Sequence, residues 1–260
     1  ISFPKFTSYH STGHFINSYA PPLRIVEQFY TENGVPIDED IDWTDIELYG
    51  LRKGDEKHKY YIEPGFETAN LHFDREARFY GSIFFDGGLF YGNGRNDETG
   101  MWTTHFKYGA AFGWSSTAHP ETGYMVKKII HRLTSTTTTS TSISYYRYAF
   151  PIIRLADIYL LYAEALNETK DAPDQEVYEY IDLVRNRTGL KNVVESWSNH
   201  SLYPDKPLTK EGMREIIQRE RINELAFEGA RFWDLRRWKL AEVYMNTPIR
   251  GLSIMEEKAS

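Results

Sequence analysis

Residues 219–239 read RERINELAFEGARFWDLRRWK, a stretch that combines ten charged residues with two Phe and two Trp. Ile222, Leu225, Ala226 and Gly229 fall at positions i, i+3, i+4 and i+7, which predicts one packed face of a helix. We expect Gly229 to allow the close approach of another helix, and the chain to bend after it. Six basic and four acidic residues surround this face, so we expect ion pairs that become partly buried when the helix packs.

The residues that follow the bend begin a second apolar face. Phe232, Trp233 and Leu235 form this face, and we expect Trp233 and Trp238 to be core residues. A helix that binds nucleic acid would need a basic stripe, whereas the charges here are interleaved. The stretch is therefore predicted to hold helices together rather than to contact a ligand.

The composition narrows the classes of function. The chain has 260 residues, 41% of them hydrophobic, which is enough for a sizeable core. Its net charge of −7 argues against nucleic acid as the main partner, and the lack of Cys excludes disulfides and thiolate metal sites. Aromatic residues make up 15% of the chain, more than a core needs, so we expect some of them on a binding surface.

Helical periodicity dominates after residue 150. The apolar run 152–167 is interrupted by Arg154, Asp157 and Glu164 and is too short to cross a membrane, so it predicts a helix that is largely buried.

Two further helices are predicted from their capping residues. Asp174 is placed to cap a helix that ends at Gly189, and this helix with the preceding one has the size of one tetratricopeptide-like unit. Thr209 is placed to cap the long helix that runs into residues 219–239.

The part before residue 150 is irregular and rich in loops. A short helix is expected at 23–30, and RFYGSIFFDGGLFYGNG at 78–94 predicts a β-hairpin with its turn at 86–88. No period is visible from Gly92 to Gly123. Because this segment carries several aromatic residues, it is typical of a functional loop rather than of disorder.

No cofactor or metal site is predicted. The acidic run from Asp38 to Asp45 lacks the Gly and Glu positions of an EF-hand loop, so a solvated acidic loop is expected. His10 and His14 are four residues apart, but the Glu of the zinc-protease pattern is missing. GNGRNDETG at 92–100 follows no strand–helix unit of the phosphate-binding type, and the chain contains no Gly-x-Ser-x-Gly motif.

The stretch ERINELAFEGARFWDLRRWK is very similar to the signature of the SusD/RagB family of outer-membrane nutrient-binding lipoproteins. The resemblance covers roughly Tyr19 to Leu240 in register. The other segments that carry it, in the usual order of the family, are YAPPLRIVEQFYTENGVPID, DREARFYGSIFFDGG, GYMVKKI, FPIIRLADIYLLYAEALNE, YIDLVRNRTGL and LTKEGMREIIQRERINEL.

The resemblance implies a fold that is mainly α. This is the tetratricopeptide-like helical SusD fold, here its C-terminal part, with an irregular loop-rich region that contains the short hairpin. Residues 1–149 would form the ligand-facing region and residues 150–260 the helical part with the signature. Family members are much longer and commonly end in a tail that is not found here, so the N-terminal half of the family fold is expected to be absent and would supply cover for the apolar helix.

The resemblance also implies a function. Family members capture oligosaccharides, or in some cases peptides, as lipid-anchored lids on a TonB-dependent outer-membrane transporter of the SusC type. The expected location is therefore the outer membrane, as a surface-exposed lipoprotein whose lipid anchor lies outside this chain. The expected partners are an oligosaccharide or polysaccharide, the transporter and the missing half of the same protein.

The candidate ligand-binding residues follow from the chemistry of sugars. Sugar rings stack on aromatic side chains, and their hydroxyls exchange hydrogen bonds with Asn, Asp and Arg. For each aromatic candidate the alternative is that it pins an irregular loop to the core. The candidates are Trp102 and Trp114, then Tyr91, Trp43 and Tyr49, with Asn93, Arg95, Asn96 and Asp97 as hydrogen-bonding residues.

Three other functions are weighed against glycan capture. A peptide-binding member of the same family is the first. A glycoside hydrolase would need two carboxylates held about 5–10 Å apart, and no motif nominates such a pair. A helical-repeat scaffold would need more than the single repeat-like unit that the sequence offers.

Overall fold

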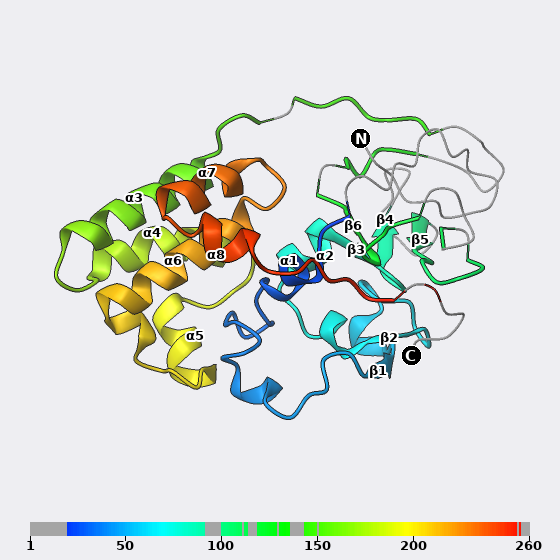
Figure 1. The fold of residues 1–260 in the computed structure, drawn as a ribbon, viewed down its shortest axis with the longest axis horizontal. Coiled ribbons are helices and arrows are strands. Elements are labelled where there is room, and N and C mark those ends of the chain that lie inside the picture. The colour runs from blue at the N-terminus through cyan, green and yellow to red at the C-terminus, as the bar shows by residue number, and fades with distance from the viewer. Residues whose placement is uncertain are drawn as a thin grey trace.

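The computed structural model describes residues 20–91, 100–110, 112–113, 119–128, 130–135, 143–149, 151–253 and 255. Figure 1 shows the long helices at one end of the molecule and the short strands at the other, with α1 and α2 between them. The fold is mainly helical, as predicted, and its strands form only short pairs. The helices are α1 (Leu23–Glu27), α2 (Ala77–Ser82), α3 (Leu155–Thr169), α4 (Gln175–Arg187), α5 (Val193–His200), α6 (Lys210–Glu224), α7 (Ala230–Arg237) and α8 (Ala241–Met245).

The predicted helix caps are present. The Asp174 carboxylate accepts a hydrogen bond from the Val177 N–H at 3.3 Å, and the Thr209 hydroxyl accepts one from the Gly212 N–H at 3.1 Å. Gly189 ends the helix that Asp174 begins, with a φ of +83° that is unfavourable for residues with a side chain.

The core of the helical end lies between α3, α4, α5 and α6. Leu160 and Ala163 of α3 are buried there. Helix α5, which was not predicted from the sequence, adds Trp197, whose ring packs edge-on against Tyr30 at 5.9 Å. Tyr30 follows α1, so this contact joins the helical end to the first part of the chain.

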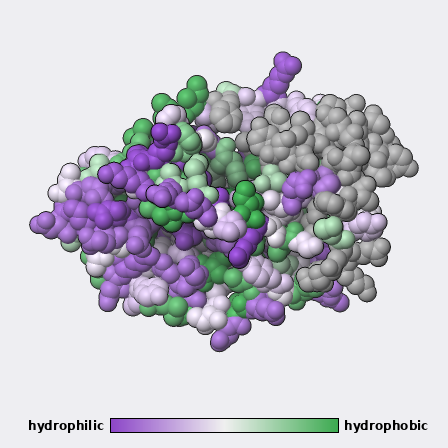
Figure 2. All heavy atoms as spheres, in the orientation of Figure 1, coloured by the Kyte–Doolittle hydropathy of each residue, from purple (hydrophilic) through white to green (hydrophobic). Residues whose placement is uncertain are grey.

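Much of α3 is exposed in the described chain, so the prediction that it is largely buried is wrong there. Ile152 is 94% exposed and lies before the helix, which begins only at Leu155. Figure 2 shows hydrophobic residues at the upper edge of the molecule, where the chain leads into α3. The reason is geometric: the main packing contacts of α3 are with α4 and α6, and the side of α3 that carries Leu155 and Ile158 stays exposed.

The signature stretch divides into two helices. Its packed residues Ile222, Leu225 and Ala226 are buried as predicted, but α6 ends at Glu224. The predicted close approach at Gly229 is wrong, because no described atom lies within 4 Å of the position where a Cβ would stand. Gly229 instead has a φ of +89° and begins α7, which produces the predicted bend.

The aromatic residues of α7 and of the segment after it are less buried than predicted. Trp233 is 68% exposed, so its predicted core position is wrong in the described chain, whereas Leu235 is buried. Trp238 is half-buried, and its indole N–H donates to Glu164 at 2.8 Å. An amphipathic helix that packs on one side does not bury its whole circumference, and only the Leu235 side of α7 faces the core.

The predicted β-hairpin at 78–94 is also wrong. Residues 77–82 form α2, and the two strands that flank the turn at 86–88 do not pair with each other. The backbones of Gly87 and Gly88 instead exchange hydrogen bonds with Thr104 at 2.9 and 3.0 Å, which directs each strand to a different partner. The antiparallel pairs are β1 (Leu51–Lys53) with β2 (Glu67–Ala69), β3 (Ile83–Phe85) with β6 (Tyr124–Val126), and β4 (Leu89–Tyr91) with β5 (Met101–Thr103).

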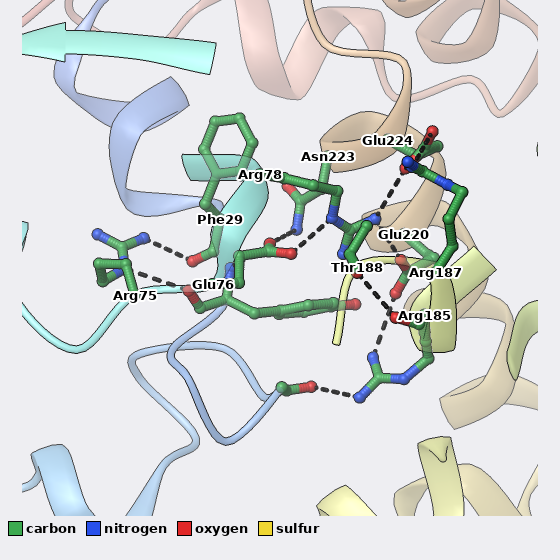
Figure 3. Close-up of polar contacts among 12 residues, drawn as sticks. Phe29, Arg75, Glu76, Arg78, Arg185, Arg187, Thr188, Glu220, Asn223 and Glu224 are labelled. Carbon is green, nitrogen blue, oxygen red and sulfur yellow. Dashed lines mark hydrogen bonds and ion pairs between the residues drawn. The ribbon is translucent and has the colours of Figure 1, made fainter. Parts of the chain in front are cut away.

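A buried ion network joins the two ends of the molecule, which confirms the expected pairing of the signature charges. Figure 3 shows Arg78 of α2 reaching Glu76 and the α6 residues Glu220 and Glu224, at 2.5, 2.5 and 3.3 Å. Arg185 of α4 contacts the other oxygen of Glu220 at 3.2 Å. Burial raises the pKa of Glu76, and the charge of Arg78 opposes that rise. Both Arg78 and Arg185 are therefore needed to balance the negative charges of the buried carboxylates.

Glu224 carries a second layer of arginines. Arg187 and Arg154 each contact its carboxylate at 2.8 Å, and Arg154 also contacts Glu228 at 2.7 and 2.8 Å. Burial acts to raise the pKa of Glu224, but the surrounding arginines outweigh it and hold the pKa below its usual value. The carboxylate is thus charged and fully paired.

Removal of Arg78 is expected to destabilise the fold strongly. The Arg78→Ala variant leaves Glu76 and Glu220 buried with too few cations, which costs about 3–5 kcal/mol of unfolding free energy. Urea unfolding measures the loss. The matched control is Arg214→Ala, which removes an Arg–Glu168 pair at the surface and should cost at most about 1 kcal/mol. Equal losses in the two variants would contradict this role of the network.

Asp182 generates a pH-dependent prediction. Its carboxylate accepts the N–H of Val193, the first residue of α5, at 2.7 Å, yet burial raises its pKa to about 6. Because the folded pKa is raised, the wild-type protein gains stability as the pH falls from 7 through 6 toward the unfolded value of about 4. Asp182→Asn keeps the acceptor without the charge, so it should be more stable than wild type at pH 7 and similar at pH 4. Thermal melts at both pH values check this, and an Asn variant that is no more stable at pH 7 would contradict it.

Candidate functional site

The β4–β5 pair places two of the predicted ligand-binding residues. Phe90 lies opposite Trp102, and Tyr91 lies opposite Met101. Directly opposed residues of an antiparallel pair share a face, and successive residues alternate. Tyr91 and Trp102 therefore leave opposite faces of the ribbon and do not form one stacking surface.

Trp102 is half-buried and packs against an aromatic cluster under the ribbon. Tyr145 and Ile130 pack at the edge of the same cluster. Trp102 is thus partly a core residue, as the alternative reading of each aromatic candidate allowed. The buried members of the cluster are Phe84, Phe90, Phe106, Phe112, Met125 and Ile143.

Three further aromatic rings, two of them exposed, lie in the segments that border this cluster, and they were not predicted from the sequence. The His131 ring stacks on Tyr146 at 4.3 Å and lies 5.5 Å from the Tyr148 ring. Tyr146 and Tyr148 are 46% and 38% exposed. The run YYRY at 145–148 is the signal that could have indicated them, because three tyrosines at this density exceed what one packed edge can bury. We call His131, Tyr146 and Tyr148 the aromatic platform.

Backbone hydrogen bonds hold the platform in place. Ser135 and Ser144 form an antiparallel bridge, with N–H···O distances of 3.0 and 2.9 Å in the two directions. The Tyr146 N–H donates to the Thr134 hydroxyl at 3.4 Å. The two segments that carry the rings are thereby fixed to each other.

The other residues predicted near this loop lie outside the described part of the chain. They are Trp114, Asn93, Arg95, Asn96 and Asp97.

Trp43 and Tyr49 lie elsewhere, in the part of the core built around α1 and α2. Trp43 is 6% exposed, and the Arg75 guanidinium lies 5.9 Å from its ring. Tyr49 is half-exposed, and its hydroxyl donates to Glu27; burial and this carboxylate raise the pKa of Tyr49 to about 12. The predicted aromatic residues thus divide between two places and do not converge on one site.

Trp43 lines a cleft of about 670 Å³ between α1, the loop at 37–48, and the helices α6 to α8. Its other walls include the arginines Arg24, Arg219 and Arg231. This volume suits a small ligand or a few sugar residues.

In the part of the chain that the structure describes, neither place has the donor set of a metal centre. Within the described ranges, no group of three Asp, Glu, His or Cys residues could hold a metal ion. In the acidic run, the Asp40 carboxylate accepts hydrogen bonds from Thr31 at 2.6 Å and Asn33 at 3.0 Å, so it orders its own loop.

None of the described helices is both long enough and apolar enough to span a membrane.

Comparisons with known proteins agree on one family. The model of the SusD family matches residues 2–260. Among curated proteins, the SusD-like protein P2 of Formosa agariphila is 40% identical over 88 residues, which are 34% of this chain and 16% of P2. The SusD-like protein P25 of the same organism is 37% identical over 87 residues, 34% of this chain and 15% of P25.

Solved structures extend the similarity over most of the chain. The structure of BT4246 matches with a TM-score of 0.70 and 26% identity, and the match covers 93% of this chain and 38% of BT4246. A SusD-like carbohydrate binding protein from Bacteroides fragilis matches with a TM-score of 0.52 and 23% identity over 89% of this chain and 37% of that protein, which shows the shared fold. The chain therefore spans well under half the length of these structures, and it belongs to the SusD family.

Proposed function

We propose that this protein captures oligosaccharides or polysaccharides at the cell surface and does not cleave them. The observation that carries the proposal is the aromatic platform. Its His131 ring stacks on Tyr146 and lies tilted beside Tyr148, both tyrosines are exposed, and hydrogen bonds fix the segments that carry the rings. Sugars present C–H faces that pack on such rings. Membership of a family of binding proteins supports the same function.

The platform also offers polar groups beside its rings. Arg147 is exposed between Tyr146 and Tyr148, and both tyrosines carry a hydroxyl that can donate and accept. Sugar hydroxyls need such partners because stacking alone fixes no orientation. Asn93, Arg95, Asn96, Asp97 and Trp114 stay predictions for the same role.

In the whole protein, we propose that capture serves a transporter. The ligand would pass to a TonB-dependent outer-membrane transporter of the SusC type, and the protein would be held on the outer surface by a lipid anchor. Family membership supports this arrangement. A peptide-binding role is the alternative, since an aromatic surface with hydrogen-bonding groups also suits an extended peptide.

We also propose that a further part of the protein, outside this chain, covers α3. The exposed residues Ile153, Leu155 and Ile158 form an apolar surface that a soluble domain rarely leaves open. The chain alone should therefore brighten a hydrophobic dye such as anilinonaphthalene sulfonate, and the full-length protein should not. A chain that is monomeric, melts cooperatively and stays dark with the dye would contradict this.

The central experiment measures retention and cleavage together. Affinity electrophoresis against a panel of polysaccharides should retard the protein, while a reducing-end assay detects no release of sugar. Release would contradict non-catalytic capture. Binding to peptides without retention by any polysaccharide would favour the alternative.

Substitutions in the aromatic platform test its role in the same retention assay. Tyr146→Ala and Tyr148→Ala should each weaken retention by about 2- to 12-fold, which corresponds to 0.5–1.5 kcal/mol per stacked ring. Tyr203→Ala is the matched control, because Tyr203 is 58% exposed at the helical end, away from the platform. Trp102→Ala should lower both retention and stability, since Trp102 packs on the cluster. Equal retention in the control and platform variants would exclude the platform as the binding surface.

A further inference from the structure

Three guanidinium groups meet in the cleft beside Trp43. Arg24 comes from α1, Arg219 from α6 and Arg231 from α7, so segments distant in sequence bring them together. We call these three residues the arginine cluster. Like charges gather in a folded protein only where something compensates them.

The cluster has no carboxylate partner within the described chain. Arg24 donates to the Tyr244 carbonyl, Arg219 to the Gln28 carbonyl at 3.0 Å, and Arg231 to the Gln28 side-chain oxygen at 2.8 Å. All three acceptors are neutral. The Arg24 Nε is buried and, among the described residues, has no hydrogen-bond partner.

The neighbouring arginine of the same helix shows the contrast. Arg221, two residues after Arg219, pairs with Asp157 at 2.9 Å and with Asp234 at 3.1 Å. Helix α6 thus has an arginine that pairs with carboxylates on one side, and on the side that faces the cleft an arginine without a carboxylate partner among the described residues.

The pKa of Arg231 also reflects the lack of a carboxylate partner in the described part of the chain. Burial lowers its pKa, and the charges of Arg24 and Arg219 lower it further, with only the Tyr244 hydroxyl acting in the opposite direction. The three guanidinium groups therefore repel one another, and an oxyanion beside them would offset this repulsion and could accept hydrogen bonds from them.

The acidic residues that also line the cleft are already engaged or exposed. Asp40 accepts hydrogen bonds from Thr31, Asn33 and the Asp42 N–H, and Glu27 accepts the Tyr49 hydroxyl. Asp38 is exposed to solvent. None of the three lies within ion-pairing distance of the arginine cluster.

The apolar part of the cleft lining suits the body of a sugar. Ile37, Trp43 and Leu48 supply apolar surface, and the cleft volume of about 670 Å³ exceeds what a single inorganic anion needs. We infer that the cleft binds an anionic sugar residue, with its carboxylate or sulfate group on the arginine cluster and its ring against the apolar wall. This inference rests on the proposed glycan capture and specifies the class of glycan.

The test compares acidic glycans with neutral forms of the same chains. The probes are polygalacturonate oligomers with their carboxyl-reduced forms, and carrageenan oligomers with their desulfated forms, titrated calorimetrically into the protein. At least one acidic probe should bind about tenfold or more tightly than its neutral form, which corresponds to one lost charge-assisted contact of 1.4 kcal/mol. Added salt should reduce the preference.

Variants connect the preference to the cluster. Arg231→Gln and Arg219→Gln should each abolish the preference for the acidic form, and either suffices if the other fails to fold. Arg236→Gln is the control, because Arg236 is exposed on α7, lies over the Phe232 ring and does not line the cleft. It should keep the preference.

The outcomes separate this inference from the proposed function. Acidic and neutral forms that bind equally would overturn the anionic site and leave glycan capture intact. A preference that survives in Arg231→Gln and Arg219→Gln would place the anion elsewhere and overturn the inference. Binding of free sulfate with no glycan of either kind would overturn both.

Discussion

The rest of the structure depends on the fully buried carboxylate of Glu220. It has two guanidinium partners, Arg78 from the irregular part of the chain and Arg185 from α4. An isolated carboxylate cannot be buried without a large free-energy cost, so both arginines must be in place when α6 packs. The position of α6 is thereby fixed relative to the elements on each side of it. The charged residues of the signature stretch thus form the ion pairs that connect the two ends of the molecule.

A second buried guanidinium sets the position of α1 in a different way. Arg75 donates to the carbonyls of Val26, Phe29, Tyr30 and Leu71 at 2.6–3.2 Å, and burial lowers its pKa to about 10. It therefore replaces the backbone partners that a short helix cannot supply at its own end. Hydrogen bonds from Arg75 fix α1, and the ion pairs of Glu220 fix α6. The cleft between the two helices is therefore formed by rigid walls.

The sequence predicted the features that depend on local chemistry. Asp174, Thr209 and Gly189 have caps or conformations dictated by residues within one turn, and the structure confirms each. The failures at the 86–88 turn, at Gly229 and at Trp233 all concern which distant element lies nearby, information that periodicity does not contain. The candidate ligand-binding residues stay predictions. Aromatic content indicated a binding surface but could not single out Tyr146 and Tyr148, because the segment that carries them is positioned by the bridge between Ser135 and Ser144.

The type of an aromatic residue indicates whether its ring is exposed better than the number of aromatic residues in the chain does. In the described chain, the large buried rings are mostly Phe, whereas the exposed ones are mostly Tyr, with Phe232 and Trp233 of α7 as exceptions. A Tyr ring can stay at the surface because its hydroxyl remains hydrated, and the same hydroxyl can exchange a hydrogen bond with a ligand that stacks on the ring. Exposed Tyr therefore combines the two contacts that a sugar needs. By this reasoning, the exposed tyrosines of the platform suit stacking against a glycan better than the half-buried Trp102 beside them.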